Sequence, residues 1–130
     1  PGYVLLAGGV GVTPMMSMLR TFADRGESRP IILFFGSYSW DTVLYREEIG
    51  ELEKRLNLKV VHVLEQPPEG WSGEVGYITS DVLDRHLPQD RASYQYFVCG
   101  PLPMINAVEP ALKEAGVPFQ RVESERYEMA

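Results

Sequence analysis

The chain has 130 residues, of which 45% are apolar and 23% are charged, and this composition is typical of one soluble globular domain with its own core. A formal net charge of −6 without a basic cluster argues against nucleic-acid binding, and no run of about 18 apolar residues predicts a membrane span. The single cysteine, Cys99, excludes an internal disulfide and fits a reducing compartment, so we expect a cytoplasmic location. Because a strand follows Pro1 almost at once and no initiator methionine is present, we expect residues 1–130 to be one domain of a larger protein.

The first half of the chain alternates apolar runs with segments of helical spacing. Val4–Ala7 is predicted to be a strand, and residues 14–25 a helix that can end at Gly26. Ile31–Phe35 is an uninterrupted apolar run, which is typical of a strand buried on both faces. The next helix is predicted from four residues at helical spacing: Tyr45, Ile49, Leu52 and Leu56.

The segment that follows contains one strand, one loop and one short helix. Leu58–Leu64 is predicted to be a strand, and residues 65–76, which hold two prolines and three glycines, a loop. Thr79 or Ser80 can then cap a short helix that reaches His86.

The last segment repeats the alternation and completes the fold. Tyr94–Cys99 and Phe119–Val122 are predicted to be strands, and Pro101 opens the helix between them, which Gly116 closes. Five strands alternating with helices predict an α/β fold: a three-layer αβα, Rossmann-like domain with a five-stranded parallel sheet. Ligands of such sheets bind beyond the carboxyl ends of the strands, near the point where the strand order reverses.

Residues 6–14, Leu-Ala-Gly-Gly-Val-Gly-Val-Thr-Pro, combine a strand end, a glycine turn and a helix start. Gly9 and Gly11 allow a ligand to approach the backbone, Thr13 offers a hydroxyl, and Pro14 suits the first helical turn. The helix N-terminus then favours an anion, so the stretch predicts a pyrophosphate site. The spacing is G-x-G-x-x-P instead of the usual G-x-G-x-x-G, and a tight turn without a ligand is the alternative interpretation.

A second motif, residues 97–104, lies at the carboxyl end of the fourth predicted strand. Cys99 is expected to face the ligand, Gly100 to allow close approach of a ring or ribose, and Pro101 to start a helix. The alternative for Cys99 is a small, buried and inert residue, which is the usual behaviour of a free cysteine.

Together, Gly9-x-Gly11-x-Thr13-Pro14 and Cys99-Gly100-Pro101-x-x-Met104 resemble the ferredoxin–NADP reductase-like superfamily. The resemblance covers essentially the whole chain and corresponds to the C-terminal nucleotide-binding domain of that superfamily. Further segments are also similar to that superfamily. Residues 35–37 and 45–49 resemble its second strand and the helix after it, residues 63–65 and 71–78 its third strand and the loop after it, and residues 124–129 the end of some members. The ending is similar to the tails of bacterial members related to ferric reductases, which implies the cytoplasmic domain of a membrane-anchored parent protein.

The resemblance implies a domain that binds NADH or NADPH and passes hydride to the N5 atom of a flavin. FAD would be held by a preceding β-barrel domain, which no segment of this chain resembles. The electrons would then pass singly to haem, an iron–sulfur centre, ferric iron or oxygen. A non-catalytic module that binds a nucleotide or a partner is the alternative function, because a fold alone does not determine activity.

The resemblance also implies two groups of site residues. Cys99 is expected beside the nicotinamide, where it shapes the hydride-transfer pocket, and Glu125 near the contact between nicotinamide and flavin. The residues expected to bind the cofactor are Gly8, Gly9, Gly11, Thr13, Pro14, Ser37, Glu65, Gly100, Pro101, Met104 and Tyr127. For Tyr127, an exposed place in a loose chain end is an equal alternative. No metal site is expected, because His62 and His86 lack partners at metal-ligand spacing.

The choice between NADH and NADPH depends on the charges near the 2′ position of the adenosine ribose. Residues 64–74 and 36–45 contain no arginine or lysine, and Glu65 follows the third predicted strand. A carboxylate repels a 2′-phosphate but can accept hydrogen bonds from a ribose diol, so we expect NADH rather than NADPH. A solvated loop residue is the alternative for Glu65. Trp40 and Trp71 are expected on the adenine side, where they either stack on adenine or cover the core.

Overall fold

The structure is a computed structural model that describes the backbone of residues 1–127 and the side chains of residues 1–125. Within the described residues, one sheet of six parallel strands has the order β4-β3-β2-β1-β5-β6. The strands are β1 (Tyr3–Gly8), β2 (Ile31–Ser37), β3 (Leu58–Leu64), β4 (Glu74–Val75), β5 (Gln95–Pro101) and β6 (Val122–Tyr127). The helices are α1 (Val12–Asp24), α2 (Arg46–Arg55), α3 (Ser80–His86) and α4 (Leu102–Glu114).

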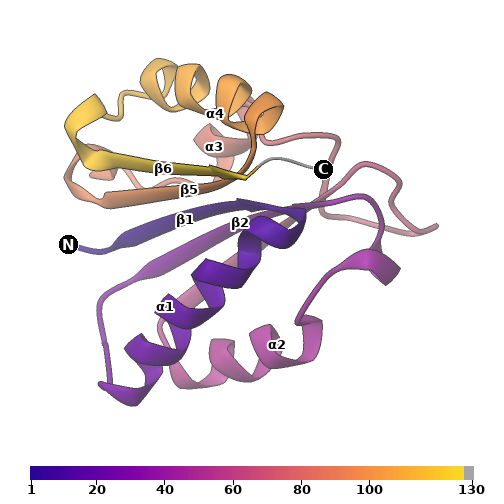
Figure 1. Ribbon diagram of the computed structural model, residues 1–130, viewed down its shortest axis with the longest axis horizontal. Coiled ribbons are helices and arrows are strands. Elements are labelled where there is room, and N and C mark those ends of the chain that lie inside the picture. The colour runs from indigo at the N-terminus through magenta and orange to yellow at the C-terminus, as the bar shows by residue number, and fades with distance from the viewer. Residues whose placement is uncertain (128–130) are drawn as a thin grey trace.

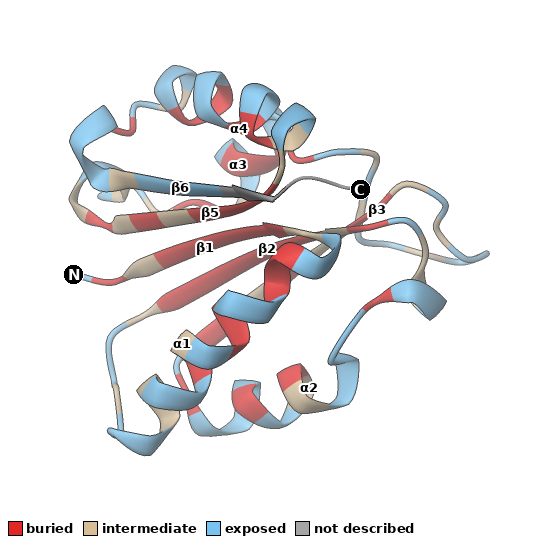
Figure 2. Cartoon of the chain, viewed as in Figure 1, coloured by how far each residue is buried: buried red, intermediate tan, exposed pale blue. Residues whose placement is uncertain are grey.

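Two helices cover each face of the sheet, with α1 and α2 on one side and α3 and α4 on the other (Figure 1). Alternate residues of each central strand enter different cores, because successive side chains of a strand point to opposite faces. Leu6 and Phe34 lie in the core under α3 and α4, and Leu5 and Phe35 in the core under α1 and α2. All four side chains are fully buried, so β1 and β2 are red almost throughout in Figure 2. The carboxyl ends of β1 and β2 are therefore anchored in the core, and the candidate functional site described below lies at these ends.

The predicted α/β fold with a parallel sheet between two helical layers is confirmed, with one strand more than expected. The additional strand, β4, lies inside the predicted loop 65–76 and pairs with β3, Leu64 lying beside Val75. It has only two residues, too few for a visible apolar pattern. Within the described part of the chain, no helix is long and apolar enough to cross a membrane.

The predicted final strand, Phe119–Val122, was wrong in its placement. Phe119–Arg121 forms a 3-10 helix, and β6 begins at Val122, where the prediction ended. The reason is exposure. Phe119 is 84% exposed, and β6 is an edge strand whose Glu123, Ser124 and Glu125 are exposed. A polar edge strand shows no apolar pattern in the sequence, whereas an exposed phenylalanine wrongly suggests a buried strand residue.

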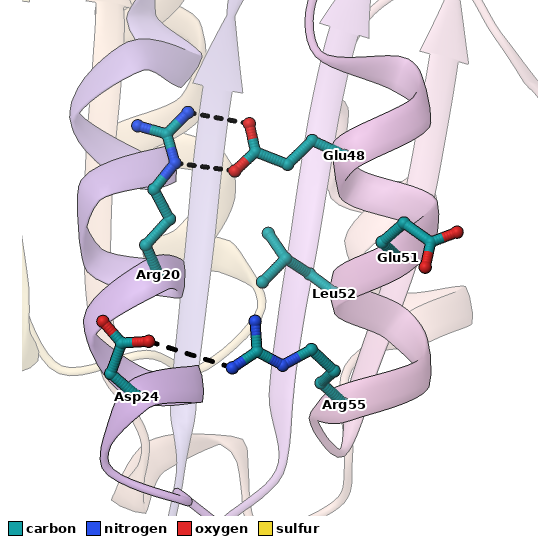
Figure 3. A pocket seen from close by; sticks show the side chains of 6 residues that line it. All are labelled: Arg20, Asp24, Glu48, Glu51, Leu52 and Arg55. Atoms are coloured by element: carbon teal, nitrogen blue, oxygen red, sulfur yellow. Dashed lines mark hydrogen bonds and ion pairs between the residues drawn. The ribbon is translucent and has the colours of Figure 1, made fainter.

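Charged side chains join the outer surfaces of α1 and α2 (Figure 3). Arg20 donates two hydrogen bonds of 2.7 Å to the carboxylate of Glu48, and Arg55 lies 3.8 Å from Asp24. The hydrogen bonds from Arg20 lower the pKa of Glu48. These residues line a hollow of about 270 Å³ between the helices. Because its charges are paired with one another and exposed to solvent, we interpret this hollow as a salt-sensitive helix–helix contact and not as a ligand site.

Candidate functional site

The strand order reverses between β1 and β5. From β1 the chain moves through β2 and β3 to β4, and it then returns to the other side of β1 to form β5 and β6. In open parallel sheets, ligands bind at the carboxyl ends of the strands on either side of such a reversal. Helix α1 begins shortly after β1 and α4 directly after β5, so two helix N-termini lie at this place. We call residues 8–14 and 99–101 the β1–β5 edge.

The two helices at the β1–β5 edge start differently from the other two helices. Neither α1 nor α4 has a capping side chain or an acidic residue in its first turn, as far as the described side chains show. In contrast, α2 begins with Glu47 and Glu48, and α3 has Asp81 and the Thr79 hydroxyl, which accepts a hydrogen bond from a backbone N–H. The positive dipole ends of α1 and α4 are therefore not compensated by acidic side chains, and this favours an anionic ligand at the β1–β5 edge.

The predicted glycine turn forms one turn of 3-10 helix, Gly9–Gly11, between β1 and α1. Gly9 has a φ of 55°, a backbone conformation that favours glycine, and it is exposed. Gly11 is buried, and a Cβ atom on it would lie 2.2 Å from the carbonyl oxygen of Cys99. Gly11 is thus required by the packing of the turn against β5. The exposed Thr13 and Pro14 lie in the first turn of α1, as predicted, and their contacts with a cofactor remain predictions.

Met104 packs between the two strand ends of the β1–β5 edge. A Cβ atom on Gly8 would lie 2.5 Å from its sulfur, and a Cβ atom on Gly100 would lie 2.4 Å from it. Both glycines therefore make room for this half-buried side chain, which projects from the first turn of α4. Met104 and the two glycines have a packing role in addition to the cofactor contact predicted for them. Pro101 is half-buried at the end of β5.

Cys99 and Glu125 lie beside one another on the paired strands β5 and β6. Both line a pocket of about 150 Å³, together with residues of α1: Pro14, Met15 and Met18. Cys99 is only 6% exposed. Burial, and secondly the charge of Glu125, raises the pKa of its thiol, so Cys99 is a neutral thiol at pH 7. A neutral thiol is a poor nucleophile, which fits both the predicted role in shaping a pocket and the alternative of a small, buried and inert cysteine.

Ser37 ends β2, the strand next to β1. It is 8% exposed, and its hydroxyl oxygen is buried without a hydrogen-bond partner among the described residues. A buried polar atom without a partner is costly, so a hydroxyl at the carboxyl edge of the sheet fits a ligand that completes its bonding. The donors of the 9–11 turn, the two helix N-termini and this hydroxyl therefore suit a phosphate-bearing nucleotide.

Glu65 directly follows β3 at the same edge of the sheet. Its backbone N–H donates to the carbonyl oxygen of Ser37 at 3.1 Å, and its carboxylate accepts a 3.0 Å hydrogen bond from the Tyr77 hydroxyl. Tyr77 was not among the predicted site residues. It lies just past β4, which the sequence does not reveal, and it comes twelve positions after Glu65. The side chain of Tyr127, another predicted cofactor contact, lies outside what the structure describes.

Trp40 and Trp71 pack against each other, with ring centroids 5.6 Å apart, and Trp40 also packs edge-on against His62. The guanidinium of Arg46 lies over the ring of Trp40, 4.8 Å from its centroid. The two partly buried indoles pack against the core under α1 and α2, and their stacking on adenine stays a prediction. Burial, and secondly the charge of Arg46, lowers the pKa of His62.

Glu74 of β4 is held by two side chains of α3, those of Arg85 and His86. Arg85 donates to both of its carboxylate oxygens, and His86 Nε2 lies 2.7 Å from Oε2. The hydrogen bond from Arg85, with a smaller contribution from His86, lowers the pKa of Glu74 to about 2. Because its charge is compensated, Glu74 contributes less to the repulsion of a 2′-phosphate than the sequence suggested. Glu65 remains as the carboxylate at the end of β3.

The pairing of Glu74 predicts a pH-dependent stability. A lowered pKa in the folded state stabilises the fold above the ordinary pKa of 4.5, and this contribution is lost as the pH falls from 4.5 to about 2. We expect Glu74→Gln to reduce the free energy of unfolding by roughly 1–3 kcal/mol at pH 7. Urea unfolding of both proteins at several pH values measures this. The difference should shrink below pH 4.5, whereas the exposed Glu51→Gln should cause no comparable loss. A difference that is constant from pH 7 to pH 3 would contradict the assignment.

The chain is similar to known proteins over most of its length. Residues 5–110 match the family described as oxidoreductase NAD-binding domain. NADH-cytochrome b5 reductase 1 of Debaryomyces hansenii is 33% identical over 128 residues, which are 93% of this chain and 44% of that protein. The protein of the same name from Cryptococcus neoformans is 32% identical over 131 residues, with coverage of 93% and 45%. The chain therefore spans less than half the length of these curated relatives.

Solved structures agree with the sequence comparison. The cytochrome b5 reductase domain of Ulva prolifera nitrate reductase superimposes with a TM-score of 0.85 at 25% identity, covering 95% of this chain and 48% of that one. Flavohemoglobin from Malassezia yamatoensis, solved with bound FAD and heme, gives a TM-score of 0.84 at 29% identity, covering 98% of this chain and 32% of that one.

Proposed function

This chain belongs to the oxidoreductase NAD-binding domain family, and we propose that it is the nucleotide-binding domain of a flavin-dependent reductase that uses NADH. The observation that carries the proposal is the β1–β5 edge. There, two helices without acidic first-turn residues begin next to the 9–11 turn, which is packed against Cys99. Relatives with about 33% identity are themselves named reductases, which favours an enzyme over a non-catalytic module.

In this proposal each part of the β1–β5 edge has a defined task. The backbone of the 9–11 turn and the N-terminus of α1 bind the pyrophosphate, and Ser37 donates its free hydroxyl to the nucleotide. Cys99 and Glu125 border the place of the nicotinamide, which supplies a hydride to the flavin when the cofactor is bound. The neutral thiol of Cys99 excludes water there without adding charge, and the missing side chain of Gly100 lets Met104 pack beside the strand end.

The remaining parts of the reductase are proposed to lie outside this chain, which spans less than half of its curated relatives. An FAD-binding domain would present its flavin to the pocket between α1 and β6. The electrons would pass on to an acceptor such as haem, an iron–sulfur centre, ferric iron or oxygen. We further propose a cytoplasmic location, which the single free cysteine supports, in a parent protein that can be membrane-anchored.

Reduction of the flavin by NADH in the intact protein tests the proposed function. We expect the catalytic efficiency with NADH to exceed that with NADPH by about tenfold or more, because each charge of a 2′-phosphate near Glu65 costs about 1 kcal/mol even in water. Steady-state kinetics with both nucleotides measures the ratio. Glu65→Gln removes the charge and should lower the ratio. A wild-type protein that prefers NADPH would contradict the assignment of Glu65.

A further inference from the structure

We propose that Met104 is a modification site: hydrogen peroxide oxidises its thioether to a sulfoxide, and the sulfoxide weakens nucleotide binding at the β1–β5 edge. The inference rests on the proposed function. Its starting point is the place of the Met104 sulfur atom, which lies where side chains of two glycines would otherwise lie. A Cβ atom on Gly8 would be 2.5 Å from this sulfur, and a Cβ atom on Gly100 would be 2.4 Å from it.

The sulfur fills the gap that opens where β1 and β5 separate. The register of the two strands ends with Ala7 beside Cys99, and Gly8 and Gly100 are the next residues along. Met104 reaches between these glycines from the first turn of α4. The strand order reverses here, so the sulfur lies at the base of the place where a ligand is expected. An oxygen atom added to the sulfur must therefore push the strand ends apart or project toward the ligand.

Met104 is also more accessible than most other methionines whose side chains the structure describes. It is half-buried, next to the exposed Leu102, whereas Met15 and Met16 of α1 are 2% and 0% exposed. Met18 is half-buried as well, in the wall of the pocket beside Cys99. Peroxide in solution can therefore reach Met104 and Met18, and of these two only Met104 packs between the strand ends.

The oxidation transfers one oxygen atom and one electron pair. The O–O bond of hydrogen peroxide breaks, a bond forms between one of its oxygens and Sδ of Met104, and water leaves. The thioether is oxidised and the peroxide is reduced. Peroxide is what a reduced flavin produces when oxygen accepts an electron pair, and oxygen is among the acceptors proposed above. The product is a polar side chain whose new oxygen accepts hydrogen bonds, and methionine sulfoxide reductases reverse the reaction.

The new oxygen would compete with the nucleotide for the same donors. The first turn of α4 has neither an acidic residue nor a capping side chain among its described residues, so its N–H groups favour an anion. A sulfoxide on Met104 brings the negative end of its S–O dipole to this helix start. Because this oxygen is covalently attached, it competes with the nucleotide at any concentration of NADH.

Treatment of the intact protein with hydrogen peroxide, followed by its removal, tests the inference. Peptide mass spectrometry should show sulfoxide at Met104 well before Met15 and Met16. KM for NADH should rise about tenfold, the value of one hydrogen bond to a charged group. Methionine sulfoxide reductases A and B, which together reduce both epimers, should restore KM. Dithiothreitol alone, which reverses sulfenic acid at Cys99, should not restore it.

Two variants assign the effect to one sulfur atom, and each is compared with its own untreated sample. Met104→Leu keeps an apolar side chain of similar size, and peroxide should leave its KM unchanged. Met18→Leu is the matched control and should show the full rise in KM.

Three results would overturn the inference and leave the proposed function standing. The first is complete conversion of Met104 to the sulfoxide with an unchanged KM. The second is a Met104 that stays unoxidised while the fully buried Met16 reacts. The third is a rise in KM that persists in Met104→Leu or vanishes in Met18→Leu. An untreated wild-type protein whose flavin is not reduced by NADH would overturn the proposed function as well.

Discussion

Substitution of Gly11 by valine is expected to abolish stable folding of the domain, and Gly11→Ala is expected to lower the free energy of unfolding by roughly 3 kcal/mol or more. The reason is a contact between two backbone segments. A Cβ atom at this position would lie 2.2 Å from the carbonyl oxygen of Cys99 and 2.7 Å from its carbonyl carbon. Neither atom can move aside without separating the 9–11 turn from β5. Thermal and urea unfolding of the intact protein measure the loss.

Two other glycines provide graded controls. Gly50 lies within α2, and a Cβ atom on it would have no neighbouring atom within 4 Å, so Gly50→Ala should raise the free energy of unfolding by about 0.5–1 kcal/mol. At Gly100 a Cβ atom would meet the flexible end of Met104, so Gly100→Ala should cost less than Gly11→Ala, and the double variant with Met104→Ala should regain part of the loss. A Gly11→Ala protein as stable as wild type would show that the turn does not pack on β5 in this way.

The second large effect is expected in hydride transfer. Cys99→Ala and Glu125→Ala should each slow the reduction of the flavin by NADH by roughly tenfold or more, because both residues border the proposed place of the nicotinamide and misplacement by about 1 Å can cost a hundredfold in rate. Stopped-flow reduction of the intact flavoprotein at saturating NADH measures the limiting rate.

Three comparisons make this kinetic test specific. Cys99→Ser keeps the shape of the side chain but has a smaller, more polar hydroxyl in place of the thiol, and it should lie between wild type and Cys99→Ala. Glu123→Ala, which changes another exposed glutamate of β6 that lines the same pocket, should have a smaller effect than Glu125→Ala, because Glu125 pairs directly with Cys99. Flavin reduction at the wild-type rate in both Cys99→Ala and Glu125→Ala would remove these residues from the reaction.

The central part of the fold could be predicted because its residues combine burial with local geometry. The strands β1, β2, β3 and β5 are mainly apolar, and glycines end α1 and lie between β1 and α1. The two edge strands could not be predicted in the same way. β4 has two residues, and β6 is exposed and polar, so neither carries the periodic apolar signal on which such predictions depend.

The site could be predicted only where a motif is contiguous in the sequence. The glycine turn and the end of β5 were found because each lies in one short segment. That Gly11 is required by the carbonyl of Cys99, and that Met104 fills the space beside Gly8 and Gly100, depends on contacts between segments far apart in the sequence. The pairing of Tyr77 with Glu65 was missed because it depends on β4.

A crystal structure of the intact protein with NAD⁺ bound tests the central claim most directly, namely that the β1–β5 edge binds the nicotinamide nucleotide. The predicted result is a pyrophosphate against the backbone of residues 9–11 at the start of α1, with the nicotinamide ring beside Cys99 and the adenosine ribose near Glu65. A nucleotide bound at any other part of the domain, or one bound at this edge in the reverse direction with its adenine beside Cys99, would contradict it.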